Sequence, residues 1–198
     1  MKILLIDNHT EHKRALADAL SGHEVEIQKY RPGLDFHTAD KDLVILSGGG
    51  GEGREIDDAI KAGHLWYQDE LDFVKSYDGP MLGICMGFEI ISRAYGSEVE
   101  EMPETLEGFF DLKLTRRGKK EFSRKIIRQR EAHKWRVKKT PKGFKVLSKS
   151  PTGVEIISHK AKPIIATQFH PELGGTLSLN TICKQIVQTS WNNYRKML

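Results

Sequence analysis

The chain has 198 residues, of which 38% are hydrophobic and 29% are charged. This length and apolar content predict one domain over residues 1–198 with a substantial core, and leave too little chain for two domains. No apolar run is long enough to span a bilayer, and the chain begins with strand-like residues rather than a charged and then apolar leader, so we expect a soluble, cytoplasmic protein. The net charge of +4 permits weak contact with nucleic acid, but a modest basic excess is more often solvated surface or a patch for a protein partner.

The two cysteines, Cys85 and Cys183, lie far apart in very different local settings. They predict neither a disulfide framework nor a metal cluster, and they fit a reducing compartment. We therefore expect no cofactor and no metal.

The first half of the chain alternates short apolar runs with helical stretches, an order that predicts β-α-β units and a parallel sheet. A glycine cluster at residues 47–53 interrupts this alternation. The expected strands are Ile3–Ile6, Val25–Gln28, Leu43–Leu46 and Pro80–Ile84, and the expected helices are Glu11–Leu20, Ile56–Ala62, Leu65–Tyr77 and Phe88–Tyr95.

The second half changes to short strand-like runs separated by turn residues, which predicts partly antiparallel pairing. An amphipathic helix over Leu179–Tyr194 closes the chain. Together the halves predict an α/β fold with a flavodoxin-like open sheet, mostly parallel with some antiparallel strands in the second half, and helices on both faces. The expected strands here are Phe109–Leu114, Phe122–Ile127, Phe144–Leu147, Val154–Ile157 and Ile164–Gln168.

Cys85 stands between two glycines where an expected strand meets an expected helix. This pattern is typical of a nucleophile elbow, a turn so sharp that side chains at Gly83 and Gly87 would clash with neighbouring strands. The helix N-terminus favours the thiolate, so we expect a lowered thiol pKa. The alternative is that Cys85 is a small buried hydrophobe and the glycines are ordinary turn formers.

A base for this thiol is supplied by the segment Gln168-Phe169-His170-Pro171-Glu172, which ends an expected strand. Residues two apart in extended chain project to the same side, so Glu172 can hold one ring nitrogen of His170 while the other faces the thiol. A lone histidine at a strand end is more often a satisfied polar residue. Cysteine, then histidine, then glutamate in an α/β chain nevertheless meets the requirement for nucleophile, base and orienting group.

The elbow, the His-Pro-Glu segment and the upstream Leu-Ser-Gly-Gly together resemble the class I glutamine amidotransferase family over nearly the whole chain. Within that family the chain is most similar in style to the free-standing amidotransferase subunits of GMP synthase. The resemblance implies hydrolysis of glutamine to glutamate and ammonia through a cysteine thioester. It also implies a separate synthetase subunit that accepts the ammonia, because the chain lacks a phosphate-cradling Gly-x-x-x-x-Gly-Lys loop for ATP. The segments that carry the subfamily likeness are Ile6–Asn8, Ser47–Gly49 and Gly143–Leu147.

The elbow itself predicts that the N–H of Met86 stabilises an oxyanion, and the resemblance adds the N–H of Gly49. The family usually continues with proline after the paired glycines, whereas this chain has Gly50 and Gly51. We therefore expect a softer loop that becomes organised when substrate or a partner arrives, followed by an insert-like stretch over residues 52–63.

The remaining expected substrate-binding residues are Glu89, His133, Lys134 and Trp135. Trp135 stands where GMP synthase subunits commonly carry an acidic residue, and plain packing is its alternative role. Glu89 replaces the family's usual glutamine. It should face the pocket and disfavour a free α-carboxylate, or else merely complement the helix dipole.

Two other functions use the same residues differently. One is a stand-alone γ-glutamyl hydrolase or peptidase, and the other is a non-catalytic regulatory module that kept the fold. The basic stretch over residues 113–149 predicts a docking face for an acidic partner, with nucleic-acid binding or a solvated surface as alternatives. Its densest part holds Arg116, Arg117, Lys119 and Lys120.

Overall fold

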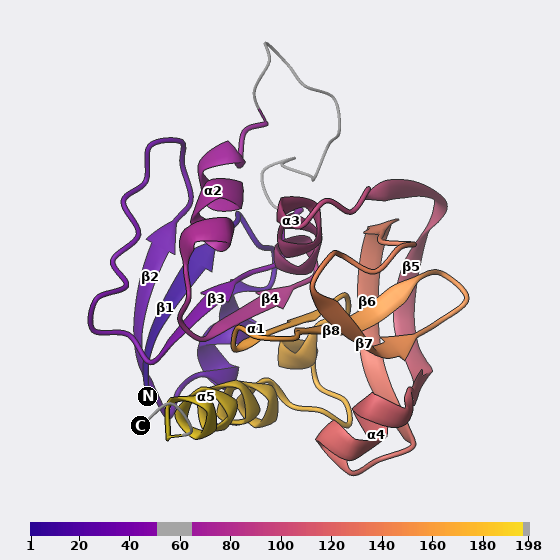
Figure 1. Ribbon diagram of the computed structural model, residues 1–198. Coiled ribbons are helices and arrows are strands. Elements are labelled where there is room, and N and C mark those ends of the chain that lie inside the picture. The colour runs from indigo at the N-terminus through magenta and orange to yellow at the C-terminus, as the bar shows by residue number, and fades with distance from the viewer. Residues whose placement is uncertain (51–64, 196–198) are drawn as a thin grey trace.

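A computed structural model describes residues 1–50 and 65–195, and it confirms the expected α/β fold. Within these residues, nine strands form one sheet in the order β2-β1-β3-β4-β9-β8-β7-β5-β6, with helices on both faces (Figure 1). None of the described helices is long and apolar enough to cross a membrane. The strands are β1 (Lys2–Asp7), β2 (Glu24–Lys29), β3 (Leu43–Leu46), β4 (Met81–Ile84), β5 (Glu100–Leu114), β6 (Ile126–Arg136), β7 (Phe144–Lys149), β8 (Val154–His159) and β9 (Ile164–Thr167).

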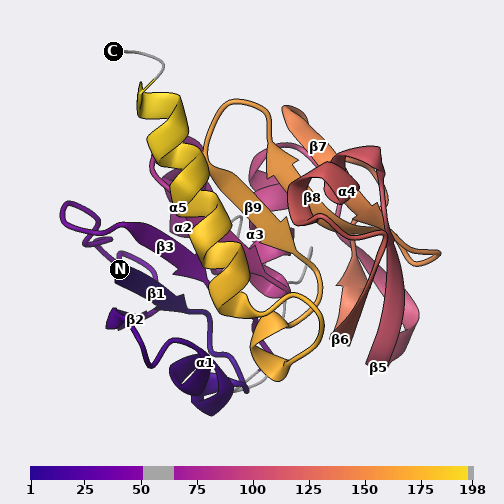
Figure 2. The same cartoon turned by 90° about the horizontal axis from the view of Figure 1, so that it is seen from below.

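The parallel half of the sheet comprises β2, β1, β3, β4 and β9. Side chains of β1 alternate between two cores: Ile3 packs in the layer under α1 and α5, and Leu4 packs in the layer under α2 and α3. Figure 2 shows α5 lying across the first of these faces. The helices are α1 (Lys13–Ala19), α2 (Gln68–Ser76), α3 (Met86–Ala94), α4 (Arg116–Phe122) and α5 (Leu179–Arg195), with a short 3-10 turn, η3 (Pro171–Leu173).

The other four strands pair antiparallel and curl back toward the parallel half. The N–H of Val154 at the start of β8 donates to the carbonyl of Val137, just beyond β6, at 2.9 Å. The N–H of His170 likewise donates to the carbonyl of Arg130 in β6 at 2.9 Å. The edge strand β6 thus curls back toward β8 and β9, in the middle of the sheet, and lies beside the end of β9.

The second half differs from the prediction in three places. Strand β6 runs over Ile126–Arg136, whereas the predicted strand covers Phe122–Ile127. Strand β5 begins at Glu100 rather than Phe109, and helix α4 occupies residues up to Phe122, where the pattern predicts the start of a strand. Thr115 caps this helix by accepting a hydrogen bond from the N–H of Gly118 at 3.2 Å. Because α4 has only seven residues and carries four basic side chains, it shows no apolar stripe that periodicity could detect.

In the first half, the expected helix over Leu65–Tyr77 is present as the shorter α2. The expected helix over Ile56–Ala62 and the insert-like stretch lie outside the described residues.

Candidate active site

Cys85 occupies the sharp turn between β4 and α3 with a positive φ, which is rare for residues other than glycine: φ is 49° and ψ is −104°. A Cβ atom on Gly87 would lie 2.3 Å from the carbonyl oxygen of Leu46, and one on Gly83 would lie 2.6 Å from that of Gly87. Both positions therefore require glycine. A side chain at Gly87 would clash with the neighbouring strand β3, as the motif predicts, whereas one at Gly83 would clash with α3. The N–H of Cys85 donates to the carbonyl of Thr167 at 2.8 Å, which ties the turn to β9.

The thiol of Cys85 lies in a buried setting, 4.0 Å from the carbonyl oxygen of Ala132. Burial raises its pKa well above the usual value, and the carboxylates of Glu89 and Glu172 raise the pKa further. The N–H of Met86 acts in the opposite direction but is outweighed. The expected low thiol pKa is therefore wrong, because reasoning from the helix N-terminus does not include burial and nearby carboxylates.

His170 and Glu172 form a buried pair at the end of β9, with Nδ1 of His170 2.8 Å from Oε1 of Glu172. A carboxylate can only accept, so this contact places the proton of a neutral ring on Nδ1 and leaves Nε2 with a lone pair. Nε2 is buried and has no hydrogen-bond partner among the described residues.

The side chains of Cys85 and His170 both lie next to Gly48. A Cβ atom built on Gly48 would lie 3.0 Å from Cε1 of His170 and 3.6 Å from Cβ of Cys85. The two side chains thus flank the same glycine although they are far apart in the sequence. The sequence predicts that the glycine cluster approaches a ligand, but it does not predict this role of Gly48.

His12, at the N-terminus of α1, packs edge-on against His170 with ring centroids 4.7 Å apart. Burial lowers the pKa of His12, and the charge of His170 lowers it further. Sequence reasoning misses this residue because it belongs to no motif and reaches the site only through the fold.

A pocket of about 110 Å³ opens beside Cys85. It brings together Cys85 and all six residues predicted for the oxyanion hole and for substrate binding, while Gly50 and Ala132 are further lining residues that the sequence does not predict. Gly50 has a φ of +94°, a conformation that favours glycine. The lining residues are Gly49, Gly50, Cys85, Met86, Glu89, Ala132, His133, Lys134 and Trp135.

Glu89 reaches this pocket from the first turn of α3, yet its side chain is only 2% exposed. Its Oε1 accepts a hydrogen bond from Nε2 of Gln168 at 2.8 Å. Because Gln168 lies two residues before His170 at the same strand end, the carboxylate of Glu89 is positioned by the segment that carries the candidate base.

Sequence comparison identifies the class of protein that shares these features. The family described as class I glutamine amidotransferase matches residues 4–188. The chain is 35% identical over 150 residues to a glutamine-hydrolysing GMP synthase subunit of Methanococcus maripaludis, covering 72% of each protein. It is 31% identical to the corresponding GMP synthase subunit of Methanocaldococcus jannaschii, covering 92% of this chain and 94% of that one.

Two further comparisons place the chain against longer and solved proteins. A GMP synthase of Brachyspira hyodysenteriae is 28% identical over 96% of this chain, which spans only 38% of that longer protein. A crystal structure described as a GMP synthase subunit from Thermoplasma acidophilum has the same fold, with a TM-score of 0.75, 23% identity and coverage of 99% of this chain and 98% of that one.

Proposed function

This chain belongs to the class I glutamine amidotransferase family, and from that premise we propose that Cys85, His170 and Glu172 form its glutamine-hydrolysing centre. The observation that carries the proposal is the convergence at Gly48, where the nucleophile from the β4–α3 turn and the base from the end of β9 flank one point. The adjoining pocket supplies a place for the γ-amide.

Each group has a defined task in this proposal. Nε2 of His170 takes the proton from Cys85, and the sulfur attacks the side-chain carbonyl carbon of glutamine. Met86 and Gly49 both border the pocket, and in this proposal their N–H groups stabilise the oxyanion. His170 then protonates the departing ammonia, and water attacks the thioester to release glutamate. Glu172 holds the ring of His170 and stabilises the imidazolium.

The raised pKa of Cys85 means that its thiolate forms only as the proton passes to His170. A thiol buried beside carboxylates stays neutral in the resting site, because an isolated thiolate there would be strongly disfavoured. Transfer of its proton to His170 creates a thiolate and an imidazolium together, which offsets that cost. The proposed enzyme therefore activates its sulfur by proton transfer within the pair, and its resting thiol is protonated.

We infer further that the ammonia passes to a synthetase on a separate chain, and that the pair makes GMP. Support comes from the names of the relatives, which are glutamine-hydrolysing subunits of GMP synthase, and from the longer GMP synthase, of which this chain spans only part. A stand-alone γ-glutamyl hydrolase would use the same three residues, but the relatives do not favour it. Glu89, whose carboxylate borders the pocket, does not separate the two functions, because free glutamine and γ-glutamyl peptides carry the same α-carboxylate.

The test measures ammonia release from glutamine by the chain alone and with a candidate ATP-dependent GMP synthetase subunit. The amidotransferase proposal expects ammonia release to rise with the partner present, and glutamine to support synthesis of GMP by the pair. Equal release with and without every candidate partner, together with faster cleavage of γ-glutamyl peptides, would instead establish the hydrolase. No cleavage of any γ-glutamyl compound would overturn both.

A further inference from the structure

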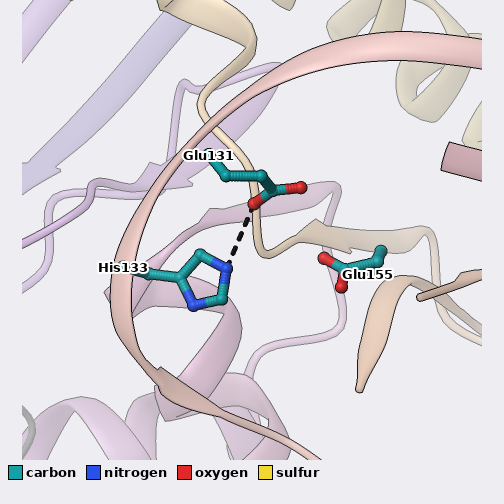
Figure 3. Close-up of side chains that lie close together, drawn as sticks. All are labelled: Glu131, His133 and Glu155. Atoms are coloured by element: carbon teal, nitrogen blue, oxygen red, sulfur yellow. Dashed lines mark ion pairs between the residues drawn. The ribbon is translucent and has the colours of Figure 1, made fainter. Parts of the chain in front are cut away.

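Three buried side chains of types that can bind a metal ion lie close together (Figure 3). Glu131 and His133 project from β6, and Glu155 projects from β8. One ligand atom from each lies within 4.8 Å of the others, and the residues are 0%, 5% and 1% exposed. Strands β6 and β8 are not neighbours in the sheet, so only its curl brings these groups together.

The hydrogen bonds of the cluster leave its inner atoms unsatisfied. Oε1 of Glu155 accepts from the hydroxyls of Ser150 and Thr152, whereas its Oε2 has no hydrogen-bond partner among the described residues. The same holds for both carboxylate oxygens of Glu131, one of which lies 3.2 Å from Nε2 of His133 as an ion-pair contact. Buried polar atoms without partners are rare in folded proteins and indicate a missing ligand or proton.

The histidine of the cluster is already oriented as a metal ligand. Nδ1 of His133 lies 2.6 Å from the carbonyl oxygen of Trp135. Since a carbonyl can only accept, the ring donates from Nδ1; once Nε2 gives up the proton that it shares with Glu131, as binding of a cation requires, its lone pair faces Glu131. A backbone carbonyl that fixes the distal nitrogen of a histidine is the usual support of a metal-binding imidazole.

The charge of the cluster limits the ligands that it can bind. Two buried carboxylates require compensation, because an unpaired buried charge is strongly destabilising. Two bound protons, or one divalent cation, make the group neutral. Mixed carboxylate oxygen and imidazole nitrogen ligands suit Zn²⁺ and similar transition ions, whereas Mg²⁺ and Ca²⁺ prefer oxygen ligands alone.

We propose that Glu131, His133 and Glu155 bind a divalent transition cation of the Zn²⁺ type, through one carboxylate oxygen from each glutamate and Nε2 of the histidine. The two hydroxyls on Oε1 of Glu155 orient its other oxygen toward the ion. Bound there, the cation joins β6 to β8 and holds the pocket wall that includes Ala132 and His133.

The experiment measures Zn²⁺ binding to the purified full chain by calorimetry and by metal content after dialysis. Cys85→Ala is used as the background, since the catalytic thiol is itself a metal ligand. The proposal expects about one tightly bound Zn²⁺ per chain, a rise in melting temperature with Zn²⁺ but not with Mg²⁺, and release of protons on binding.

Glu155→Gln is the deciding variant, because the amide oxygen can still accept from the hydroxyls while the ligand charge is lost. It should weaken Zn²⁺ binding at least about tenfold, whereas Glu104→Gln, on the exposed part of β5, should leave it unchanged. Equal binding by all three proteins places the ion elsewhere and overturns the proposal. If Glu155→Gln fails to fold, the Cys85→Ala protein decides, since absence of saturable Zn²⁺ binding to it refutes the site. None of these readouts requires glutamine hydrolysis.

Discussion

The imidazole of His12 packs edge-on against the imidazole of His170, with ring centroids 4.7 Å apart. A positive charge at His12 would oppose the imidazolium that His170 must become during thiol activation. The lowered pKa of His12 keeps its ring neutral near pH 7, so the reaction avoids that repulsion.

We predict that His12→Lys lowers kcat about tenfold or more, equivalent to at least ~1.4 kcal/mol, whereas His12→Gln retains most activity. Steady-state glutamine hydrolysis near pH 7.5 checks this, with His37→Lys, an exposed histidine next to no site residue, as the control. Similar losses in both His12 variants would mean that packing, and not charge, is what His12 supplies.

Labelling should separate the two cysteines. Cys183 is fully buried in α5, and burial raises the pKa of its thiol to about 12. A glutamine-like electrophile should modify Cys85 alone, since it occupies the pocket and uses His170 to form the thiolate. Simple iodoacetamide should react slowly with both thiols, and mass spectrometry of the labelled peptides distinguishes them.

Cys85→Ala should abolish hydrolysis without unfolding the protein, and His170→Ala should cost nearly as much, because members of one catalytic unit are not additive. Equal labelling of Cys85 and Cys183 by the glutamine-like electrophile would count against the assignment.

The substitution Glu89→Gln tests whether the charge of Glu89 affects binding of the α-carboxylate of the substrate. The glutamine side chain can still accept from Gln168, and it removes a buried negative charge beside the sulfur. We predict a higher kcat/KM for free glutamine, because the charge that opposes its α-carboxylate is removed, and a parallel rise for γ-glutamyl peptides, which carry the same α-carboxylate. Glu98→Gln, at an exposed position, is the matched control. If both specificity constants stay within about twofold, a change below ~0.5 kcal/mol, Glu89 does not read substrate.

Helix α4 presents exposed basic side chains on the surface, where the charge pattern predicts a docking face. Reversing the charges should slow association with an acidic synthetase partner at low salt and matter little at high salt. Stopped-flow association rates check this, with reversal of the exposed Lys160 and Lys184 as the control. An unchanged on-rate would remove the docking role. The four reversed residues are Arg116, Arg117, Lys119 and Lys120.

Glu70 makes stability depend on pH. It is fully buried in α2, where burial raises its pKa to about 8, from 4.5, although Asn8 donates to it at 3.0 Å. The folded state therefore binds this proton more tightly than the unfolded state, so stability falls as pH rises through the range from 4.5 to about 8.

Glu70→Gln should consequently stabilise the protein at about pH 8.5, by on the order of 1 to 3 kcal/mol, and have little effect at about pH 5. Urea unfolding at both pH values measures it. In metal-free protein, part of the slope should remain in the variant, because burial also raises the pKa of Glu155. Identical pH dependence of the two proteins would show that Glu70 is not the titrating group.

Local pattern predicts the parallel half of the fold well. The apolar runs of β1, β3 and β4 are short, continuous and buried on both faces, so sequence and structure agree within a residue or two. The predicted β5 is too short because Pro103 and the charges around it do not alternate in a strand pattern.

The candidate site likewise contains residues that local motifs predict and residues that only the fold brings into place. Cys85, His170 and Glu172 belong to motifs whose local geometry carries chemical information, and the fold carries all three to one end of β4 and β9. His12, Gln168 and Glu155 reach their places through contacts between distant segments, which no local pattern encodes. The prediction for the thiol pKa fails for the same reason, since burial is a property of the whole fold.

The hydrogen bond from the N–H of His170 to the carbonyl of Arg130 attaches the backbone of the candidate base to β6. One residue further along β6 lies Glu131, and beyond it Ala132 and His133 border the pocket. On the opposite, exposed side of β6, the side chain of Arg130 pairs with Glu107 of β5 at 2.9 Å. One residue of β6 therefore links the outer surface of the sheet to the backbone that carries the candidate base, so a ligand bound at this ion pair would lie one residue away from the active site.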